Sequence, residues 1–133
     1  MIKVETLGML DIAKINPVLK ADKDVINYSF VTEDDEVYLV SNTITGDDSY
    51  KEDVVLKAGT YLNGYNVKAW EGQKLVVDGK HIVGGVDGLA KDTVLVVAED
   101  GKLTAGEATG VHFVVKEHVM LTEKAVKVKI VVA

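Results

Sequence analysis

The chain has 133 residues, which is enough for one domain whose hydrophobic core needs no disulfide to hold it. Its formal net charge is −6, its basic side chains are lysine and three histidines, and cysteine is absent. Proteins that bind nucleic acid use arginine forks on phosphates and bases, so we expect no nucleic-acid partner. Without cysteine there is no disulfide framework and no thiolate chemistry.

The residue usage favours an all-β fold. Valine occurs 24 times and glycine 12 times, and β-branched side chains fit the pleated surface of a sheet better than a helix. We predict one small sandwich or barrel-like domain of short antiparallel strands at residues 25–133, preceded by an extended N-terminal arm at residues 1–24. The sequence has no run of about 18 apolar residues and no signal-peptide pattern, so we expect no membrane partner.

The arm has a mixed pattern. Ile2 and Val4 alternate with charged residues, as in a short strand, whereas Leu7 and Leu10 follow no fixed spacing. A helical turn at residues 9–14 is the alternative for part of this segment. The arm is therefore predicted to be loosely tied to the domain.

Two strands are predicted next, at residues 25–32 and 36–42, on either side of a turn in the sequence EDDE. In the first strand, alternation places Ile26, Tyr28 and Phe30 on one face and Val25, Asn27, Ser29 and Val31 on the other, and we expect one of the two faces to be well covered. An acidic loop, TITGDDSYKED, follows the second strand.

From residue 54 onward, turn residues punctuate the chain at short intervals. Asn-Gly and Asp-Gly dipeptides supply the left-handed residues that tight turns require, and we expect a hairpin around Asn63-Gly64. A short helix is an alternative at residues 86–92 or 117–124. The predicted strands lie at residues 54–57, 60–62, 65–70, 74–77, 81–83, 93–98, 111–116 and 124–132.

The last of these strands has the clearest pattern. In AVKVKIVVA, the side chains of Val126, Val128 and Ile130 share one face, and those of Lys127 and Lys129 share the other. Such alternation is typical of a strand with one buried face and one solvated face.

Residues that could carry chemistry are sparse. His81, His112 and His118 lack the further ligands that a zinc site needs, although His112 and His118 would share a face of one regular strand. The acidic loop does not follow the EF-hand order, and calcium binding there is left open beside a solvated loop. GGVDG and GKLTAG lack the pattern of a phosphate-binding loop, and no serine lies in a G-x-S-x-G setting. We therefore predict a protein that is not an enzyme and uses no cofactor.

Two segments carry a resemblance to a known family. Residues 53–70, DVVLKAGTYLNGYNVKAW, join an apolar strand to a Lys-Ala-Gly turn and a Thr-Tyr-Leu segment. Residues 93–123, TVLVVAEDGKLTAGEATGVHFVVKEHVMLTE, run from a valine-rich strand through Ala-Glu-Asp to a closing strand. This order resembles the small head decoration, or cement, proteins of tailed phages, broadly the lambda-type group. The hairpin at residues 25–42 is an addition to that pattern.

The resemblance implies a structural protein of the virion that is made in the host cytoplasm. It would bind the major capsid protein on the outer surface of the head, stabilise the shell and form homo-oligomers, as large as a trimer. An extended arm can add a strand to an exposed sheet edge of a partner. The candidate partner-binding residues are Ile2, Val4, Leu7 and Leu10 in the arm, and Tyr61, Tyr65 and Trp70 in the predicted hairpin.

Two alternatives stay open at this point. For any single one of the three aromatic side chains, packing in the core is the favoured alternative to partner binding. The whole chain would also suit a receptor- or glycan-binding module of a phage tail, a fibre or an adhesin. Copy number in the particle separates a shell protein from a tail protein.

Overall fold

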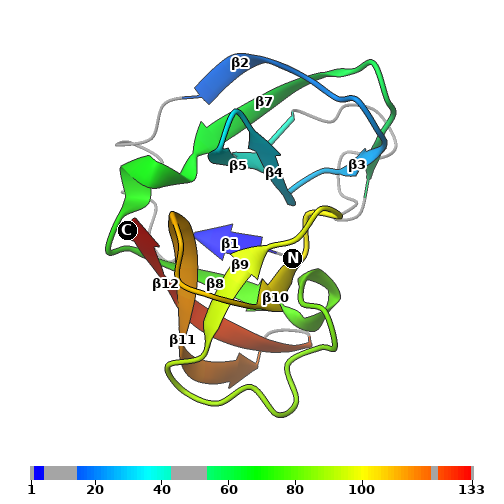
Figure 1. Cartoon of the computed structure of the whole chain (residues 1–133). Coiled ribbons are helices and arrows are strands. Elements are labelled where there is room, and N and C mark those ends of the chain that lie inside the picture. The colour runs from blue at the N-terminus through cyan, green and yellow to red at the C-terminus, as the bar shows by residue number, and fades with distance from the viewer. Residues whose placement is uncertain (1, 5–14, 43–53, 121–122, 133) are drawn as a thin grey trace.

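The computed structural model describes residues 2–4, 15–42, 54–120 and 123–132. Within them the chain forms strands and two short 3-10 helices (Figure 1). All strand pairs in the three sheets are antiparallel. The all-β fold class predicted from the sequence is confirmed.

The largest sheet has six strands and curves around the main core (Figure 1). The residue Ile82, which follows the inner strand at residues 74–78, forms a parallel bridge with Leu103 of the edge strand at residues 103–105. This bridge brings the two ends of the curved sheet towards each other, so the sheet is nearly closed on itself. Its strands, in spatial order, are β1 (Ile2–Val4), β8 (Lys74–Asp78), β12 (Lys124–Val132), β11 (Val111–Met120), β9 (Val94–Val97) and β10 (Leu103–Ala105).

A four-stranded sheet lies over the six-stranded sheet (Figure 1), and a two-stranded sheet lies beside it. The four strands, in spatial order, are β2 (Ile15–Lys20), β7 (Tyr61–Asn66), β5 (Glu36–Val40) and β4 (Phe30–Glu33). The two-stranded sheet pairs β3 (Val25–Ile26) with β6 (Val55–Leu56). The 3-10 helices are η2 (Val67–Trp70) and η3 (Gly79–His81).

The main core lies between the two larger sheets. The predicted alternation in β12 is confirmed, because Val126, Val128 and Ile130 are fully buried while the intervening lysines are half-exposed. Phe30 of β4 contacts Phe113 of β11 across the core, with ring centroids 5.0 Å apart. Both sheets therefore bury one face each in a shared hydrophobic cluster.

Strand β5 is buried on both faces. Val37 and Leu39 belong to the main core, whereas Tyr38 and Val40 belong to a second cluster that includes Leu56 of β6. A strand covered on both sides has no solvated face, so its residues do not alternate between apolar and polar. This explains why EVYLV is an almost continuous apolar run.

Two asparagines replace regular strand pairing at the end of β5. The side chain of Asn27, which is 1 % exposed, accepts from the N–H of Asn42 at 2.9 Å and donates to its carbonyl at 3.0 Å. Asn42 in turn donates to the carbonyl of Tyr61 and accepts from the N–H of Asn63. These bonds connect the chain before β4 with β5 and β7.

The strand predicted at residues 25–32 is interrupted, so that prediction is wrong in its middle. Tyr28 has a φ of +62° and lies in a turn between β3 and β4. As a result Ile26 and Tyr28 are exposed, and only Phe30 of the expected face is buried. The N–H of Tyr28 and the carbonyl of Ser29 both bond to Val40, which is the pattern of a bulge with a left-handed first residue.

The hairpin predicted around Asn63-Gly64 is also wrong. Both residues lie inside the continuous strand β7, where Gly64 is paired with Asn16 on one side and Val40 on the other. An Asn-Gly pair makes a tight turn only when the strands on either side of it pair with each other. Here they pair with β2 and β5 instead. The turn predicted in EDDE is confirmed, and the structure shows that it has two residues, since Glu33 pairs with Glu36 while Asp34 and Asp35 have φ of 50° and 64°.

Other predictions changed at element ends. The strand predicted at residues 65–70 gives way to η2, because the side chain of Asn66 accepts from the N–H of Lys68 and starts a 3-10 turn. The strand predicted at residues 81–83 is reduced to the single bridge at Ile82. Neither alternative helix forms: residues 117–120 belong to β11, and residues 86–92 form turns. The strand β10 was not predicted.

The described parts of residues 1–24 do not form the loosely tied arm that the sequence predicts. Strand β1 pairs with β8, and strand β2 pairs with β7, so both belong to the sheets. The reason is burial: Ile2 is 5 % exposed and belongs to the main core. The helical turn suggested at residues 9–14 and the acidic loop at 43–53 lie outside the described residues.

Candidate functional site

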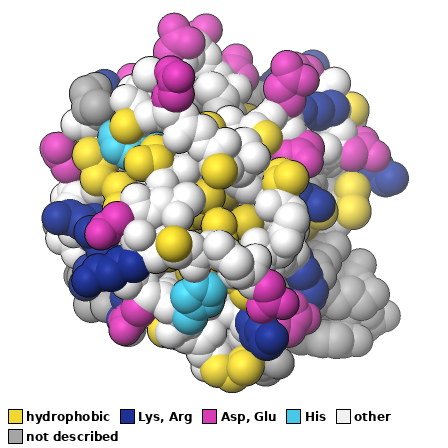
Figure 2. All heavy atoms as spheres, turned by 60° about the horizontal axis from the view of Figure 1, so that its bottom comes forward, with side chains coloured by type: hydrophobic (Ala, Val, Ile, Leu, Met, Phe, Trp, Pro, Cys, Tyr) yellow, Lys and Arg dark blue, Asp and Glu magenta, His cyan; other side chains and the backbone are white. Residues whose placement is uncertain are grey.

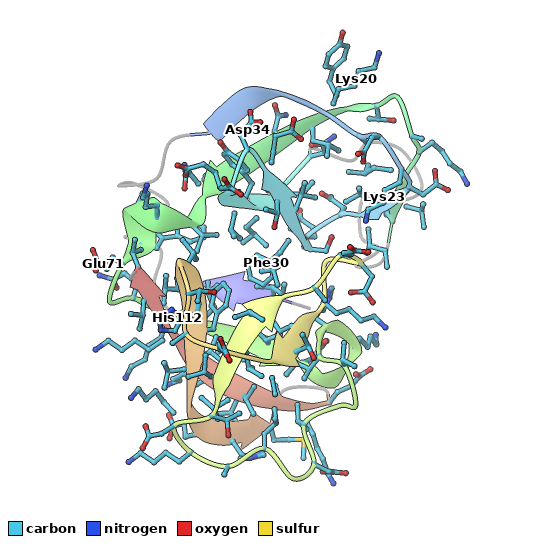
Figure 3. All side chains as sticks on the ribbon, viewed as in Figure 1. Lys20, Lys23, Phe30, Asp34, Glu71 and His112 are labelled. Atoms are coloured by element: carbon cyan, nitrogen blue, oxygen red, sulfur yellow. The ribbon has the colours of Figure 1, made fainter. Side chains whose placement is uncertain are left out.

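A groove of about 420 Å³ opens beside the edge strand β4. The segment after β2, the strand β4 and the turn between β9 and β10 form its walls. Figure 3 shows the lysine Lys23 beside that turn, and Phe30 directed from β4 towards the six-stranded sheet. Because segments from three distant parts of the sequence meet here, we treat the groove as the candidate functional site.

One wall of the groove is an unpaired strand edge. Among the described residues β4 has β5 as its only ladder partner. The turn at Asp34-Asp35 makes Glu33 and Glu36 the closing hydrogen-bonded pair, and Val40 bonds to Ser29 at the other end of the ladder. In an antiparallel ladder the bonded pairs alternate, so the backbone groups of Phe30 and Thr32 point away from β5. Thr32 is exposed.

The turn between β9 and β10 closes one end of that edge. Gly101 has a φ of +84° and is buried, and a Cβ at this position would lie 2.6 Å from the carbonyl oxygen of Phe30. The turn is held by bonds from Gly101 N–H to Ala98 O and from Ala98 N–H to Lys102 O. The free part of the edge is therefore centred on Thr32.

The groove has an apolar floor and a charged rim. Ala21, Val25 and Leu62 on its floor are buried, and Val31 and Val97 are half-buried. The rim carries more acidic than basic groups. Its charged residues are Asp22, Asp24, Glu33, Glu99 and Asp100 on the acidic side, with Lys20 and Lys23 on the basic side.

Three of the rim carboxylates are free to meet a ligand. Asp22, Glu33 and Glu99 are exposed, and within the described part of the chain their carboxylates have no hydrogen-bond or ion-pair partner. Lys23 is used differently, because its ammonium donates to the backbone carbonyl of Glu99 and so joins two walls of the groove.

Elsewhere on the surface many opposite charges are paired. On the face that Figure 2 shows, lysines and carboxylates are interspersed around hydrophobic side chains near the centre. Ion pairs in the six-stranded half include Lys80–Glu123 at 3.3 Å, Lys116–Asp92 at 3.3 Å, Lys124–Asp87 at 3.3 Å and Lys127–Glu117 at 3.1 Å. Among the described residues, exposed carboxylates without an ion pair also occur at Asp34, Asp35, Glu71 and Glu107. The groove rim is distinguished by having three of them beside an apolar lining.

Two carboxyl groups near the four-stranded sheet have lowered pKa values. The pKa of Asp24 lies below its ordinary value of 3.8, mainly because the carboxylate accepts from the N–H of Ala58 and also faces Lys57. The pKa of Glu36 lies below 4.5, mainly because its carboxylate accepts from the amide of Asn66 and faces Lys68. Asp24 thereby connects the groove wall to the loop before β7.

These shifts predict an acid-sensitive contribution to stability. A lowered pKa in the folded state means that each ionised group stabilises the fold above its unfolded-state pKa, and that this contribution is lost as the pH falls towards the folded-state pKa. The double variant Asp24→Asn, Glu36→Gln should therefore be less stable at pH 7, and its urea midpoint should fall less steeply from about pH 5 to pH 3. Equal slopes for the variant and the parent chain would contradict the assignment.

Of the three predicted aromatic binding residues, only Tyr61 is free at the surface. Its side chain is 66 % exposed, and the Lys20 ammonium lies 5.8 Å from the ring centroid. Trp70 is fully buried in the main core, and Tyr65 packs partly buried against it with ring centroids 5.5 Å apart. The core alternative is therefore correct for Trp70, and largely so for Tyr65.

The four aliphatic candidates divide in a similar way. Ile2 is a core residue, so in the folded chain it is not available to a partner. Val4 pairs with Leu75 in the β1–β8 ladder. Leu7 and Leu10 lie outside the described residues.

The histidines do not come together. An extra residue at Lys116 shifts the register of β11, so that His112 lies opposite Val131 and His118 lies opposite Val126. The face shared by His112 and His118 in the sequence prediction is thus lost through a β-bulge. Within the described residues no three His, Asp or Glu side chains are close enough to hold a metal ion.

Sequence reasoning missed the groove. No local motif marks it, because its floor and rim come from residues 20–25, 29–33, Leu62 and residues 97–101. Asp100-Gly101 is one of the Asp-Gly dipeptides that the sequence predicts to form turns, but its close approach to Phe30 depends on tertiary packing. An apolar floor beside free backbone groups is suited to binding an extended polypeptide without covalent chemistry.

Comparison of this chain with protein-family models, with curated proteins and with solved structures finds no match in any of the three. In the described part of the chain, no helix is long and apolar enough to cross a membrane.

Proposed function

We propose that the protein is a structural decoration protein that binds the outer surface of a tailed-phage head and stabilises the shell. The observation that carries this proposal is a binding surface without covalent machinery: an open β4 edge and groove, with the exposed Tyr61 on the same four-stranded sheet. The order of the segments at residues 53–70 and 93–123 supports the same class.

The proposed partner is the major capsid protein, and the proposed site of action is the capsid surface. A repeated lattice offsets weak individual contacts by offering many equivalent sites, and self-association of the decoration protein would add to this avidity. An exposed aromatic side chain such as Tyr61 can anchor such a contact when a partner pocket desolvates it.

The first test is the copy number of the chain in purified particles. A lysate of the phage that encodes it is separated on a density gradient and probed with an antibody. The proposal expects the chain to band with DNA-filled heads at a copy number comparable to that of the capsid protein. A few copies per particle would favour a tail or fibre module instead, and a chain that stays in the soluble fraction overturns the proposal.

A second arm of this test uses variants added back to heads that lack the chain. Tyr61→Ala should lower the occupancy on heads, whereas Met120→Ala should not. Met120 is a matched control because it is 68 % exposed and lies at the far end of β11, away from the four-stranded sheet (Figure 1).

A further inference from the structure

We propose that the groove beside β4 binds an extended, lysine- or arginine-bearing segment of a partner polypeptide, which adds to the four-stranded sheet as a fifth strand. This inference does not depend on the proposed capsid role, because it concerns the chemistry that the groove accepts and is tested on the purified chain alone.

The backbone of β4 sets the binding mode. Thr32 presents an N–H and a carbonyl that point away from β5, and it is exposed. Strand addition satisfies such groups by main-chain hydrogen bonds, which carry affinity without requiring a particular sequence. The turn at Gly101 covers the carbonyl of Phe30, so the added strand is short, about four residues at roughly 3.3 Å each.

The side chains around that edge set the composition of the segment. Alternate side chains of an added strand point to opposite faces. On one face of β4 they lie next to Val31, which packs against the cluster that contains Leu62, and on the other next to Phe30 and Val97 of the main core. Small apolar residues fit these positions, because the floor is already buried or half-buried.

The charge of the rim selects a basic segment. The carboxylates of Asp22, Glu33 and Glu99 are exposed and, among the described residues, unpartnered. The ammonium of Lys23 is already engaged with the Glu99 carbonyl. An acidic segment would therefore meet uncompensated like charge, whereas lysine or arginine next to the apolar positions would be attracted.

The test is a titration of the isotopically labelled full chain with the capped peptide Gly-Lys-Val-Val-Lys-Gly, followed by NMR. We expect saturable amide shifts centred on residues 31–33 and 97–101, and binding about tenfold weaker for the matched peptide Gly-Glu-Val-Val-Glu-Gly. Shifts spread over the whole acidic surface, or equal binding of both peptides, overturn the proposal. So does the absence of shifts at millimolar peptide.

A proline variant separates strand addition from simple charge attraction. Thr32→Pro removes an N–H that faces away from β5, so the ladder to β5 is kept while the edge loses a donor. We expect affinity for the lysine peptide to fall about tenfold. Ala105→Pro is the matched control: it removes an outward N–H from β10, the edge strand of the other sheet, and should leave affinity unchanged.

A charge variant keeps the proposal testable if Thr32→Pro does not fold. The double variant Asp22→Asn, Glu33→Gln changes two exposed side chains and should bind the lysine peptide about fivefold more weakly. Unchanged affinity in this variant overturns the assignment of the rim. A second copy of the chain as the occupant would instead appear as concentration-dependent self-association that shifts the amides of residues 31–33 and 97–101 without any peptide, and that outcome overturns the proposal of a separate partner.

Discussion

Replacing Trp70 by alanine should lower the free energy of unfolding by about 3–5 kcal/mol. The side chain is fully buried in the main core, and its ring packs at a tilt against that of Tyr65. Truncation leaves a cavity that the surrounding strands fill only in part, and the loss is a large share of the stability of a typical domain. Urea unfolding monitored by circular dichroism measures this loss of stability. Tryptophan fluorescence cannot be used, because Trp70 is the tryptophan of the chain and the variant lacks it.

Tyr61→Ala is the matched control for this experiment. Tyr61 is 66 % exposed, so its loss should change stability by no more than about 0.5 kcal/mol. The pair also separates core from interface roles. If Trp70→Ala folded with nearly unchanged stability and failed only in partner binding, the tryptophan would be an interface anchor after all.

Gly101→Ala should be the most damaging of the glycine substitutions in the turns. Two costs add at this position: a φ of +84°, which alanine adopts at a cost of about 1–2 kcal/mol, and a Cβ only 2.6 Å from the carbonyl oxygen of Phe30. Since that oxygen belongs to the backbone of β4, relief requires the turn to move away from the strand. We expect a total loss of about 2–5 kcal/mol.

Gly59→Ala isolates the first of these costs. Gly59 has a φ of +91°, and a Cβ there would have no heavy atom within 4 Å. The difference between the two variants in urea midpoint therefore measures the close approach of the β9–β10 turn to β4. Equal losses would show that the turn moves freely, and the groove would then lack a fixed wall.

The sequence pattern predicted the strands best where only one face is buried. Val126, Val128 and Ile130 alternate with lysines because β12 has its buried face on the main core. The prediction failed where the backbone leaves the regular strand. Tyr28 adopts a left-handed conformation in a turn, and Lys116 is an extra residue in β11, so side chains beyond each point change faces. The sequence does not mark either irregularity, because neither position 28 nor position 116 is a glycine.

Partner choice among strands explains the other failures. Asn63-Gly64 has the local chemistry of a tight turn, but burial between β2 and β5 keeps it extended. The candidate site was hidden for the same reason, because its walls become neighbours only through the pairing of sheets. The sequence allowed Tyr61 to be selected as a candidate because it is aromatic, but the exposure of its side chain could not be predicted.

Strand β8 has a consequence for how the protein acquires its structure. It is flanked by residues 2–4 on one side and by residues 124–132 on the other, so the central ladder joins segments that are more distant in sequence than almost any others in the chain. Loop closure over such separations must occur before the contacts can stabilise the fold, which makes folding slow compared with that of helical proteins. On the ribosome, the main core cannot close until residues 124–132 have left the exit tunnel. Until then, the valine-rich strands made earlier remain without their final partner.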